Sequence, residues 1–186
     1  MTPAPCLEDG HGGGTALWLA ASDGVRIRVV LWPRPGARGT VLVLPGRTEH
    51  AEKYGPTAAR LAAAGYASAA IDWRGQGLAD RLLPDPRKGH VGRFSDYQLD
   101  LDAFRGAVLA AGLPAPLFLL AHSMGGCIGL RGLIRGLDVA AAAFSAPMWG
   151  LKMPGGQTGL ISALFGALAN VGLRGRYAPP PASGAT

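Results

Sequence analysis

The sequence predicts an α/β fold in which a mostly parallel sheet carries helices on both faces. Short apolar runs typical of buried strands alternate along the chain with helix-like segments, as expected of strand–helix–strand units. Hydrophobic residues make up 48% of the 186 residues, enough for one domain with a substantial core. One apolar run, Leu117–Ala121, ends abruptly at His122-Ser123-Met124-Gly125-Gly126 before the next helix-like segment begins.

The first part of the chain is interrupted by prolines and by Gly12-Gly13-Gly14, so residues 1–14 are predicted to be a flexible lead. Asp23-Gly24 then separates two apolar runs, which is typical of a β-hairpin. The apolar patterns predict strands at 16–21, 25–32, 40–44, 66–71, 117–121 and 139–145, and helices at 53–64, 95–110 and 127–135. The strand at 40–44 is uniformly apolar, and we expect it and the strand at 139–145 to be buried.

The end of the chain differs in composition from the rest. Lys152 and Arg174 bracket an uncharged stretch whose apolar residues concentrate at 159–171. This is about a dozen residues, fewer than the roughly 20 of a membrane-crossing helix. We predict either an ordinary packed helix or an amphipathic lid that touches lipid. The predicted organisation is therefore a core at 15–150, the start of a cap at 151–178 and a proline-rich tail at 179–186.

The charge composition limits the classes of partner. Lysine and arginine exceed aspartate and glutamate by six, but they occur singly or in pairs. This pattern favours weak attraction to anionic surfaces such as phospholipid headgroups, and it argues against nucleic acid, which would need a basic stripe interleaved with aromatic residues. The sequence makes no prediction of oligomeric state.

The cysteines bear on the cellular compartment, and the spacing of possible ligand residues and glycines bears on whether a metal or cofactor is bound. Cys6 and Cys127 do not form a disulfide framework, and the N-terminus lacks the pattern of a signal peptide. We therefore expect a cytoplasmic protein, either free in the cytoplasm or peripheral at the inner membrane face. No His, Cys or carboxylate cluster has metal-ligand spacing, so no metal is predicted. Gly75-Gln76-Gly77 lacks the third glycine of a dinucleotide-binding loop, so no organic cofactor is predicted either.

The turn at 122–126 has the pattern of a nucleophile elbow, in which a sharp strand-to-helix turn lifts a serine hydroxyl above the sheet. Side chains two positions from the serine must be small, because larger ones would crowd its strained backbone. Gly125 and Ala121 meet this requirement. We predict Ser123 as a nucleophile. The alternative is a serine that only caps the following helix.

Two further motifs precede this turn. Pro45-Gly46-Arg47-Thr48-Glu49-His50 lies after one predicted strand, and Asp72-Trp73-Arg74-Gly75-Gln76-Gly77 lies after the next. With the elbow, they resemble the monoacylglycerol lipase and bacterial lysophospholipase branch of the α/β-hydrolases, a serine aminopeptidase S33-type domain. The family pattern for the first motif is His-Gly-x-x-Glu-His, so Pro45 replaces a histidine. The family pattern for the second motif is Asp-x-x-Gly-x-Gly. The resemblance covers roughly residues 15–150.

The resemblance implies hydrolysis of fatty-acyl esters, of the lysophospholipase or monoacylglycerol lipase type. Ser123 would form the acyl-enzyme, and the backbone N–H groups of Arg47 and Met124 would form the oxyanion hole. Met124 also begins a helix, whose positive dipole end favours the developing negative charge. The side chain of Arg47 either attracts a phosphate headgroup or lies in solvent.

The residues that should activate the serine are missing. In this fold an acid and then a histidine follow the nucleophile, but Ser123 is followed by one carboxylate, Asp138, and by no histidine. The four histidines precede it: His11, His50, His90 and His122. No acid or base of the triad is therefore identified. We expect local structural roles for His50 and His90, a solvated position for His11, and a surface position at a helix end for Asp138.

We accordingly expect an incomplete α/β-hydrolase fold, the N-terminal part plus the start of a cap, ended by truncation, a frameshift or a fragmentary gene model. Such a chain should be nearly inactive alone, since loss of the histidine costs on the order of a millionfold in a comparable serine enzyme. The alternative is a non-catalytic α/β-hydrolase-like module that binds a lipid or a partner through an open sheet edge.

Overall fold

The structure is a computed structural model that describes residues 1–6 and 13–150, together with residues 159, 163, 166, 167, 172 and 175. The chain divides into two units, Met1–Trp149 and Gly150–Thr186, and the first unit is described below. Apart from those scattered positions, the predicted cap at 151–178, its apolar stretch at 159–171 and the tail at 179–186 lie outside the described residues.

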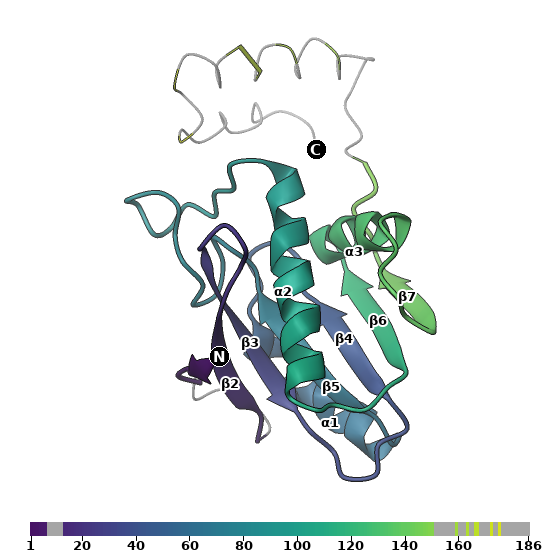
Figure 1. Cartoon of the computed structure of the whole chain (residues 1–186). Helices are drawn as coiled ribbons and strands as arrows, with labels where there is room; N and C mark the ends of the chain where they lie inside the picture. The colour runs from purple at the N-terminus through teal and green to yellow at the C-terminus, as the bar shows by residue number, and fades with distance from the viewer. Residues whose placement is uncertain are drawn as a thin grey trace, which may run out of the picture. The chain divides into compact units, whose positions relative to one another are not determined.

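The first unit is built on a mixed sheet that has seven strands among the described residues (Figure 1). The strand order is β1-β2-β3-β5-β4-β6-β7. Strands β5, β4, β6 and β7 run parallel to one another, whereas β1, β2 and β3 are joined to the sheet by antiparallel pairings. The strands span Thr2–Pro3 (β1), Thr15–Ala20 (β2), Arg26–Trp32 (β3), Thr40–Leu44 (β4), Ala67–Asp72 (β5), Leu117–His122 (β6) and Ala141–Ser145 (β7).

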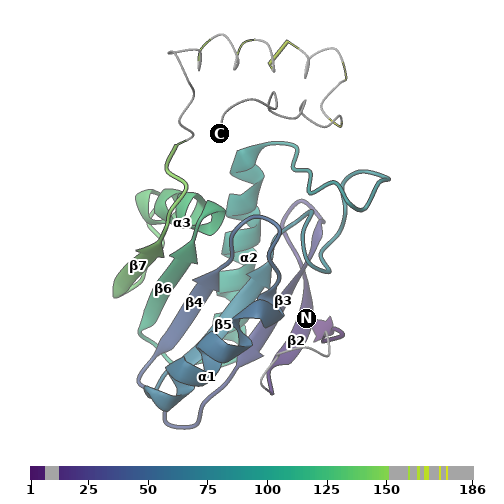
Figure 2. The ribbon, with the colours of Figure 1, turned by 180° about the vertical axis from the view of Figure 1, so that it is seen from behind.

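Helices cover both faces of the sheet, as predicted. Helices α2 (Tyr97–Ala110) and α3 (Met124–Ile134) lie on one face, and α1 (Gly55–Ala63) lies on the other (Figures 1 and 2). Short 3-10 helices, η1 (Ala51–Tyr54) and η2 (Phe94–Asp96), precede α1 and α2. No helix in the described part of the chain has the length and hydropathy that crossing a bilayer requires.

The core lies on both sides of β4, because successive side chains of a strand point to opposite faces. Leu42 and Leu44 belong to the apolar cluster that contains Phe104 of α2. Val41 and Val43 belong to the cluster that contains Ala58 of α1. All five residues of β4 are buried, which confirms the prediction made from its uniformly apolar sequence.

The structure confirms the predicted hairpin, in which β2 and β3 pair antiparallel around the turn at Asp23-Gly24. Two expectations differ from the structure. Thr2–Pro3 forms a short strand within the segment 1–14 that was predicted as a flexible lead, because it pairs with β2. The prediction that 139–145 is a buried strand is wrong: Ala141–Ala143 are exposed. Within the described residues β7 pairs only with β6, so nothing covers its outer side.

Candidate active site

The predicted elbow is a sharp turn between β6 and α3, and Ser123 lies at its apex. Its backbone has φ +48° and ψ −117°, a conformation that residues with a Cβ rarely adopt. Its carbonyl oxygen accepts the N–H of Gly126 at 2.9 Å within the turn, and two further hydrogen bonds join Ser123 to residues near the end of β7. The Ser123 N–H donates to the carbonyl oxygen of Ser145 at 3.1 Å, and the Met148 N–H donates to the carbonyl oxygen of Ser123 at 2.9 Å. The strained conformation expected of an elbow serine is therefore present.

The alternative role of Ser123, a helix cap, receives no support from its side chain. Ser123 occupies the position before α3, but its side chain makes no capping hydrogen bond. A capping serine would accept a hydrogen bond from the second or third N–H of the helix. The hydroxyl is half-buried and is not used to stabilise the helix.

Gly125 allows the elbow to approach the end of β4. A Cβ at this position would lie 2.2 Å from the carbonyl oxygen of Leu44 and 2.6 Å from that of Pro45. Both neighbours are backbone atoms, which cannot move aside easily. The requirement for glycine was predicted, but its physical reason differs from the predicted crowding of the serine: the helix start must pass close to another strand.

The loop that follows β4 lies directly beside the serine. A Cβ on Gly46 would be 3.2 Å from the Cβ of Ser123. The next residue is Arg47, and Met124 follows Ser123 at the first position of α3. Among the described residues, no acceptor is hydrogen-bonded to the backbone N–H of Arg47 or Met124. Two unused amide donors thus flank the serine from two different elements.

Glu49 organises this loop from within. Its Oε2 accepts a hydrogen bond from the Gly46 N–H at 2.7 Å and another from the Tyr54 hydroxyl at 2.6 Å, and its Oε1 pairs with Lys53. Burial raises the pKa of Glu49, but the hydrogen bonds from Lys53, Tyr54 and Gly46 outweigh it and hold the pKa below its usual value. The ionised carboxylate therefore fixes the backbone of Gly46, the residue that lies beside Ser123.

A buried ionic cluster attaches the same loop to the sheet. Arg28 of β3 binds both oxygens of Glu52 at 2.6 and 2.5 Å and donates from Nε to Asp72 at 2.9 Å. All three side chains are fully buried. Asp72 also accepts the N–H groups of Ala51, at 2.7 Å, and of Leu78, at 2.9 Å. The cluster links η1 and the turn after β5 to one arginine.

A second ionic cluster attaches the turn after β5 to helix α2 and to the β2–β3 hairpin turn. Arg74 forms ion pairs with Asp100 of α2 at 2.7 Å and with Asp23 of the hairpin turn at 2.6 Å. Its side-chain hydrogen bond to Asp23 is the main cause of the lowered pKa of that carboxyl. Asp100 is buried, and this burial raises its pKa despite the contact with Arg74. Sequence reasoning missed both clusters, although Arg28 inside an apolar strand was a visible signal.

The structure brings none of the described histidines to the serine hydroxyl. His122 Nδ1 lies 3.1 Å from the carbonyl oxygen of Ser145, and its side chain lines a cavity of about 360 Å³ together with Glu49 and Tyr54. His50 lines a different cavity, and the backbone of His90 lies against Gly75. His11 lies outside the described residues.

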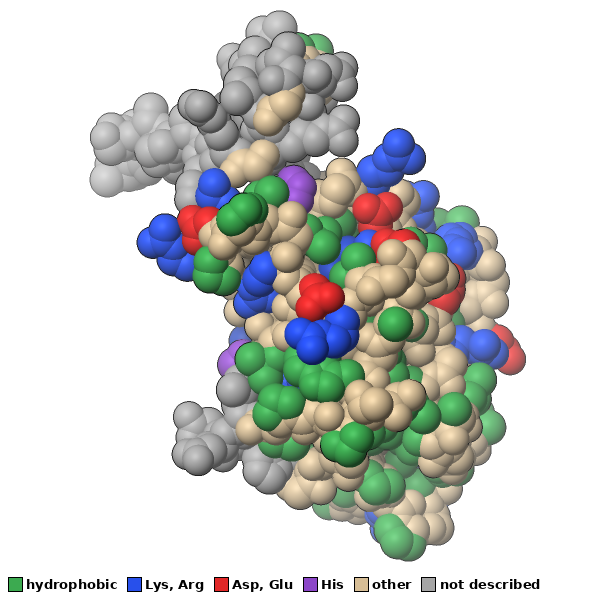
Figure 3. Space-filling view, turned by 60° about the vertical axis from the view of Figure 1, so that its left-hand side comes forward, with side chains coloured by type: hydrophobic (Ala, Val, Ile, Leu, Met, Phe, Trp, Pro, Cys, Tyr) green, Lys and Arg blue, Asp and Glu red, His purple; other side chains and the backbone are tan. Residues whose placement is uncertain are grey.

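Among the described residues, no acidic side chain and no metal-binding cluster is placed to assist Ser123. Asp138 is exposed after the end of α3. Within the described residues, no carboxylate or histidine is hydrogen-bonded to the Ser123 hydroxyl, and no three His, Cys, Asp or Glu side chains are grouped as metal ligands. On the face that Figure 3 presents, basic side chains lie among acidic and apolar ones rather than in one stripe.

The sequence matches a known family. The model of the family described as serine aminopeptidase, S33, matches residues 35–178. The chain is similar to lysophospholipase L2 of Escherichia coli K12, at 41% identity over 135 residues, which cover 71% of this chain and 40% of that protein. It is also similar to a monoacylglycerol lipase of Mycolicibacterium smegmatis, at 34% identity over 111 residues, covering 59% and 38% of the two chains.

Solved structures share the fold. A carboxyl esterase from Bacillus coagulans has a TM-score of 0.69 at 19% identity, covering 86% of this chain and 51% of the esterase. A monoglyceride lipase from Saccharomyces cerevisiae has a TM-score of 0.62 at 25% identity, covering 85% and 53%. The chain thus spans 40% of the curated lysophospholipase and about half of each of these solved structures.

Proposed function

The chain belongs to the serine aminopeptidase S33 family of α/β-hydrolases, and on this basis we propose that it is a serine hydrolase of fatty-acyl esters, of the lysophospholipase or monoacylglycerol lipase type. The observation that carries the proposal is the conformation of Ser123, at φ +48° beside Gly46 and with a hydroxyl that caps nothing. A serine that is held in a strained backbone conformation and whose hydroxyl makes no capping hydrogen bond is typical of a nucleophile. The relatives named as lysophospholipase and monoacylglycerol lipase supply the substrate class, a lipid ester.

The proposed reaction begins with attack of Ser123 Oγ on the ester carbonyl carbon. The carbonyl oxygen becomes an oxyanion, which accepts hydrogen bonds from the backbone N–H groups of Arg47 and Met124. The bond to the alcohol oxygen then breaks, and the alcohol leaves with a proton. Water attacks the resulting acyl-enzyme and releases the fatty acid, which restores the serine.

The proton of Ser123 requires a base, and the described residues provide none that is hydrogen-bonded to it. We therefore propose that these 186 residues alone hydrolyse esters on the order of a millionfold more slowly than a complete triad would. The test expresses the present chain and, beside it, one extended chain for each reading frame past the codon for Thr186. Hydrolysis of lysophosphatidylcholine and of monoacylglycerol is measured for every polypeptide.

Each polypeptide is compared with its Ser123→Ala variant. We expect an extended chain to hydrolyse an ester at a rate that this substitution abolishes. If no extension gains activity, or if the activity survives the loss of the hydroxyl, the proposed function is wrong.

A second candidate function is a non-catalytic module that binds a lipid or a partner. The exposed strand β7 favours it, because an edge with unpaired backbone groups is a template for a further strand. This function predicts a protein that purifies as a defined species with no serine-dependent hydrolysis in any reading frame.

A further inference from the structure

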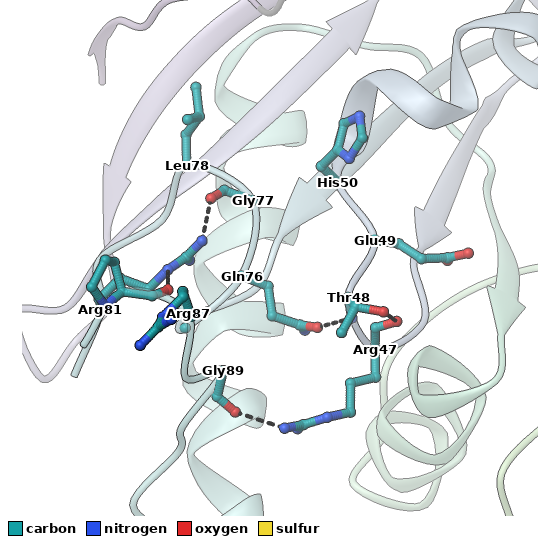
Figure 4. Close-up of a pocket in the computed structure, with 12 residues that line it drawn as sticks. Arg47, Thr48, Glu49, His50, Gln76, Gly77, Leu78, Arg81, Arg87 and Gly89 are labelled. Carbon is teal, nitrogen blue, oxygen red and sulfur yellow. Dashed lines mark hydrogen bonds between the residues drawn. The ribbon is translucent and has the colours of Figure 1, made fainter. Parts of the chain in front are cut away.

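A cavity of about 350 Å³ adjoins the loop after β4, and three arginines line it (Figure 4). Its walls come from that loop, from the turn after β5 and from the segment that leads to η2. We propose that this cavity binds the phosphate group of a lysophospholipid headgroup. The inference rests on the proposed function and specifies which of the two ester classes the site would favour.

Two of the three arginines carry charge that no carboxylate neutralises. Arg47 donates to the carbonyl oxygen of Gly89 at 3.1 Å (Figure 4). Arg81 donates to the carbonyl oxygens of Gly77 and Pro86, at 2.7 and 2.9 Å. Neither guanidinium is among the ion pairs of the described residues. Carbonyl oxygens orient a guanidinium without cancelling its charge.

The other charged groups of the cavity are compensated. Arg87 forms an ion pair with Asp85 at 3.0 Å, and Glu49 is paired with Lys53. The charged side chains that line the cavity therefore leave two uncompensated positive charges, which are held in place before any ligand binds. Guanidinium groups match the geometry of phosphate oxygens, and groups that are already oriented lose little entropy on binding.

Gln76 adds an unused donor to the same wall. Its side chain is 4% exposed, and its Oε1 accepts a hydrogen bond from the Thr48 N–H. Its Nε2 has no hydrogen-bond partner among the described residues. Buried amide nitrogens are rarely left without an acceptor, so this atom calls for an explanation. This atom has almost no accessible surface, so a phosphate oxygen in the cavity would become its acceptor only after the amide group moved.

The position of the cavity fits a headgroup because Arg47 belongs to both sites. Its backbone N–H is proposed to hold the oxyanion, and its side chain lines the cavity. In a lysophospholipid the phosphate is joined to the ester through the glycerol unit, so an ester at Ser123 would bring the phosphate toward this arginine. A monoacylglycerol has only an uncharged hydroxyl at that place.

The experiment measures equilibrium binding by calorimetry in the full chain carrying Ser123→Ala, so that hydrolysis does not contribute. The ligands are octanoyl lysophosphatidylcholine and monooctanoylglycerol, both below their micelle concentrations. We expect the phospholipid to bind about tenfold more tightly, as charge-assisted hydrogen bonds would provide. We also expect this preference to weaken as salt is raised.

Arg47→Gln, which keeps the backbone N–H, should reduce the preference to less than about threefold, and Arg47→Lys should retain part of it. Arg60→Gln is the matched control, because Arg60 is an exposed arginine of α1 outside the cavity. Equal affinity for the two lipids, or equal effects of Arg47→Gln and Arg60→Gln, would overturn the assignment.

Inorganic phosphate and glycerophosphocholine separate the two sources of phosphate. If inorganic phosphate binds more tightly than glycerophosphocholine and lysophosphatidylcholine has no advantage, the cavity takes free phosphate and the headgroup assignment is wrong. If the phospholipid binds no more tightly than the monoacylglycerol but hydrolysis depends on Ser123, the headgroup site is rejected and the proposed function is retained. A phosphate-dependent preference without hydrolysis in any reading frame would retain the site and reject the proposed function.

Discussion

The two turns that meet at the candidate active site are stabilised in opposite ways. The elbow at 122–126 depends on backbone hydrogen bonds and on the lack of a side chain at Gly125. The loop after β4, residues 45–50, depends on the side chains of Glu49 and Gln76, and the charged cluster around Arg28 holds the η1 residues that follow it. The elbow is therefore set by steric limits, whereas the loop is set by electrostatics, and different substitutions should disrupt each.

The largest loss in the free energy of unfolding is expected from removing the positive charge of Arg28, which holds η1 and the turn after β5. Arg28→Met leaves the fully buried carboxylates of Glu52 and Asp72 without their cation. Breaking a buried ion pair in this way costs about 3–5 kcal/mol, and urea unfolding measures it.

Arg26→Met is the control for this substitution, because Arg26 lies on the same strand but pairs with Asp80 at the surface. Exposed pairs contribute about 1 kcal/mol or less. Similar losses for the two variants would show that the buried cluster does not stabilise the fold as described.

The next effect is expected at the elbow. Gly125→Ala places a Cβ against two backbone carbonyl oxygens, the nearer at 2.2 Å. Overpacking of this kind should cost about 3 kcal/mol, measured as a shift of the urea midpoint at constant slope. Gly106→Ala is the matched control, since a Cβ there meets nothing within 4 Å and α2 should gain about 0.5–1 kcal/mol. An unchanged midpoint for Gly125→Ala would contradict the close approach of α3 to β4.

The smallest effect is expected from neutralising the carboxylate inside the loop. Glu49→Gln weakens charge-assisted hydrogen bonds from Gly46, Lys53 and Tyr54, and should cost about 1 kcal/mol at neutral pH. Because the folded pKa of Glu49 lies below its ordinary value of 4.5, its contribution is complete above that pH and is lost as the pH falls through the folded pKa.

The difference in unfolding free energy between Glu49→Gln and the parent chain should therefore be constant from pH 7 to pH 5 and should shrink in acid. Asp102→Asn, at an exposed pair with Arg135, is the comparison. A difference that grows toward acid would reject the proposed role of the ionised Glu49.

The same contrast explains what the sequence could predict. Strands such as Thr40–Leu44 and the elbow are encoded locally, in a run of apolar residues or in small residues around a serine, so both were predicted. The Arg28 cluster joins residues 24 and 44 positions apart, and no local pattern contains it. The exposure of β7 was missed for a related reason: burial of a strand depends on which elements cover it, not on its own composition.

The backbone conformation of Ser123, the candidate nucleophile, depends in part on hydrogen bonds to the edge of the sheet. Its N–H donates to the carbonyl of Ser145 and its carbonyl accepts the N–H of Met148, both at or just beyond the end of β7, while the N–H of Gly126 in the elbow also donates to that carbonyl. Within the described residues β7 is exposed and has one neighbouring strand. Local opening of such a strand requires less free energy than global unfolding, so Ser123 can lose two of its backbone hydrogen bonds while most of the core stays folded. Any further strand that paired with β7 would raise that opening energy, and it would thereby stabilise the strained conformation of Ser123 without contacting it.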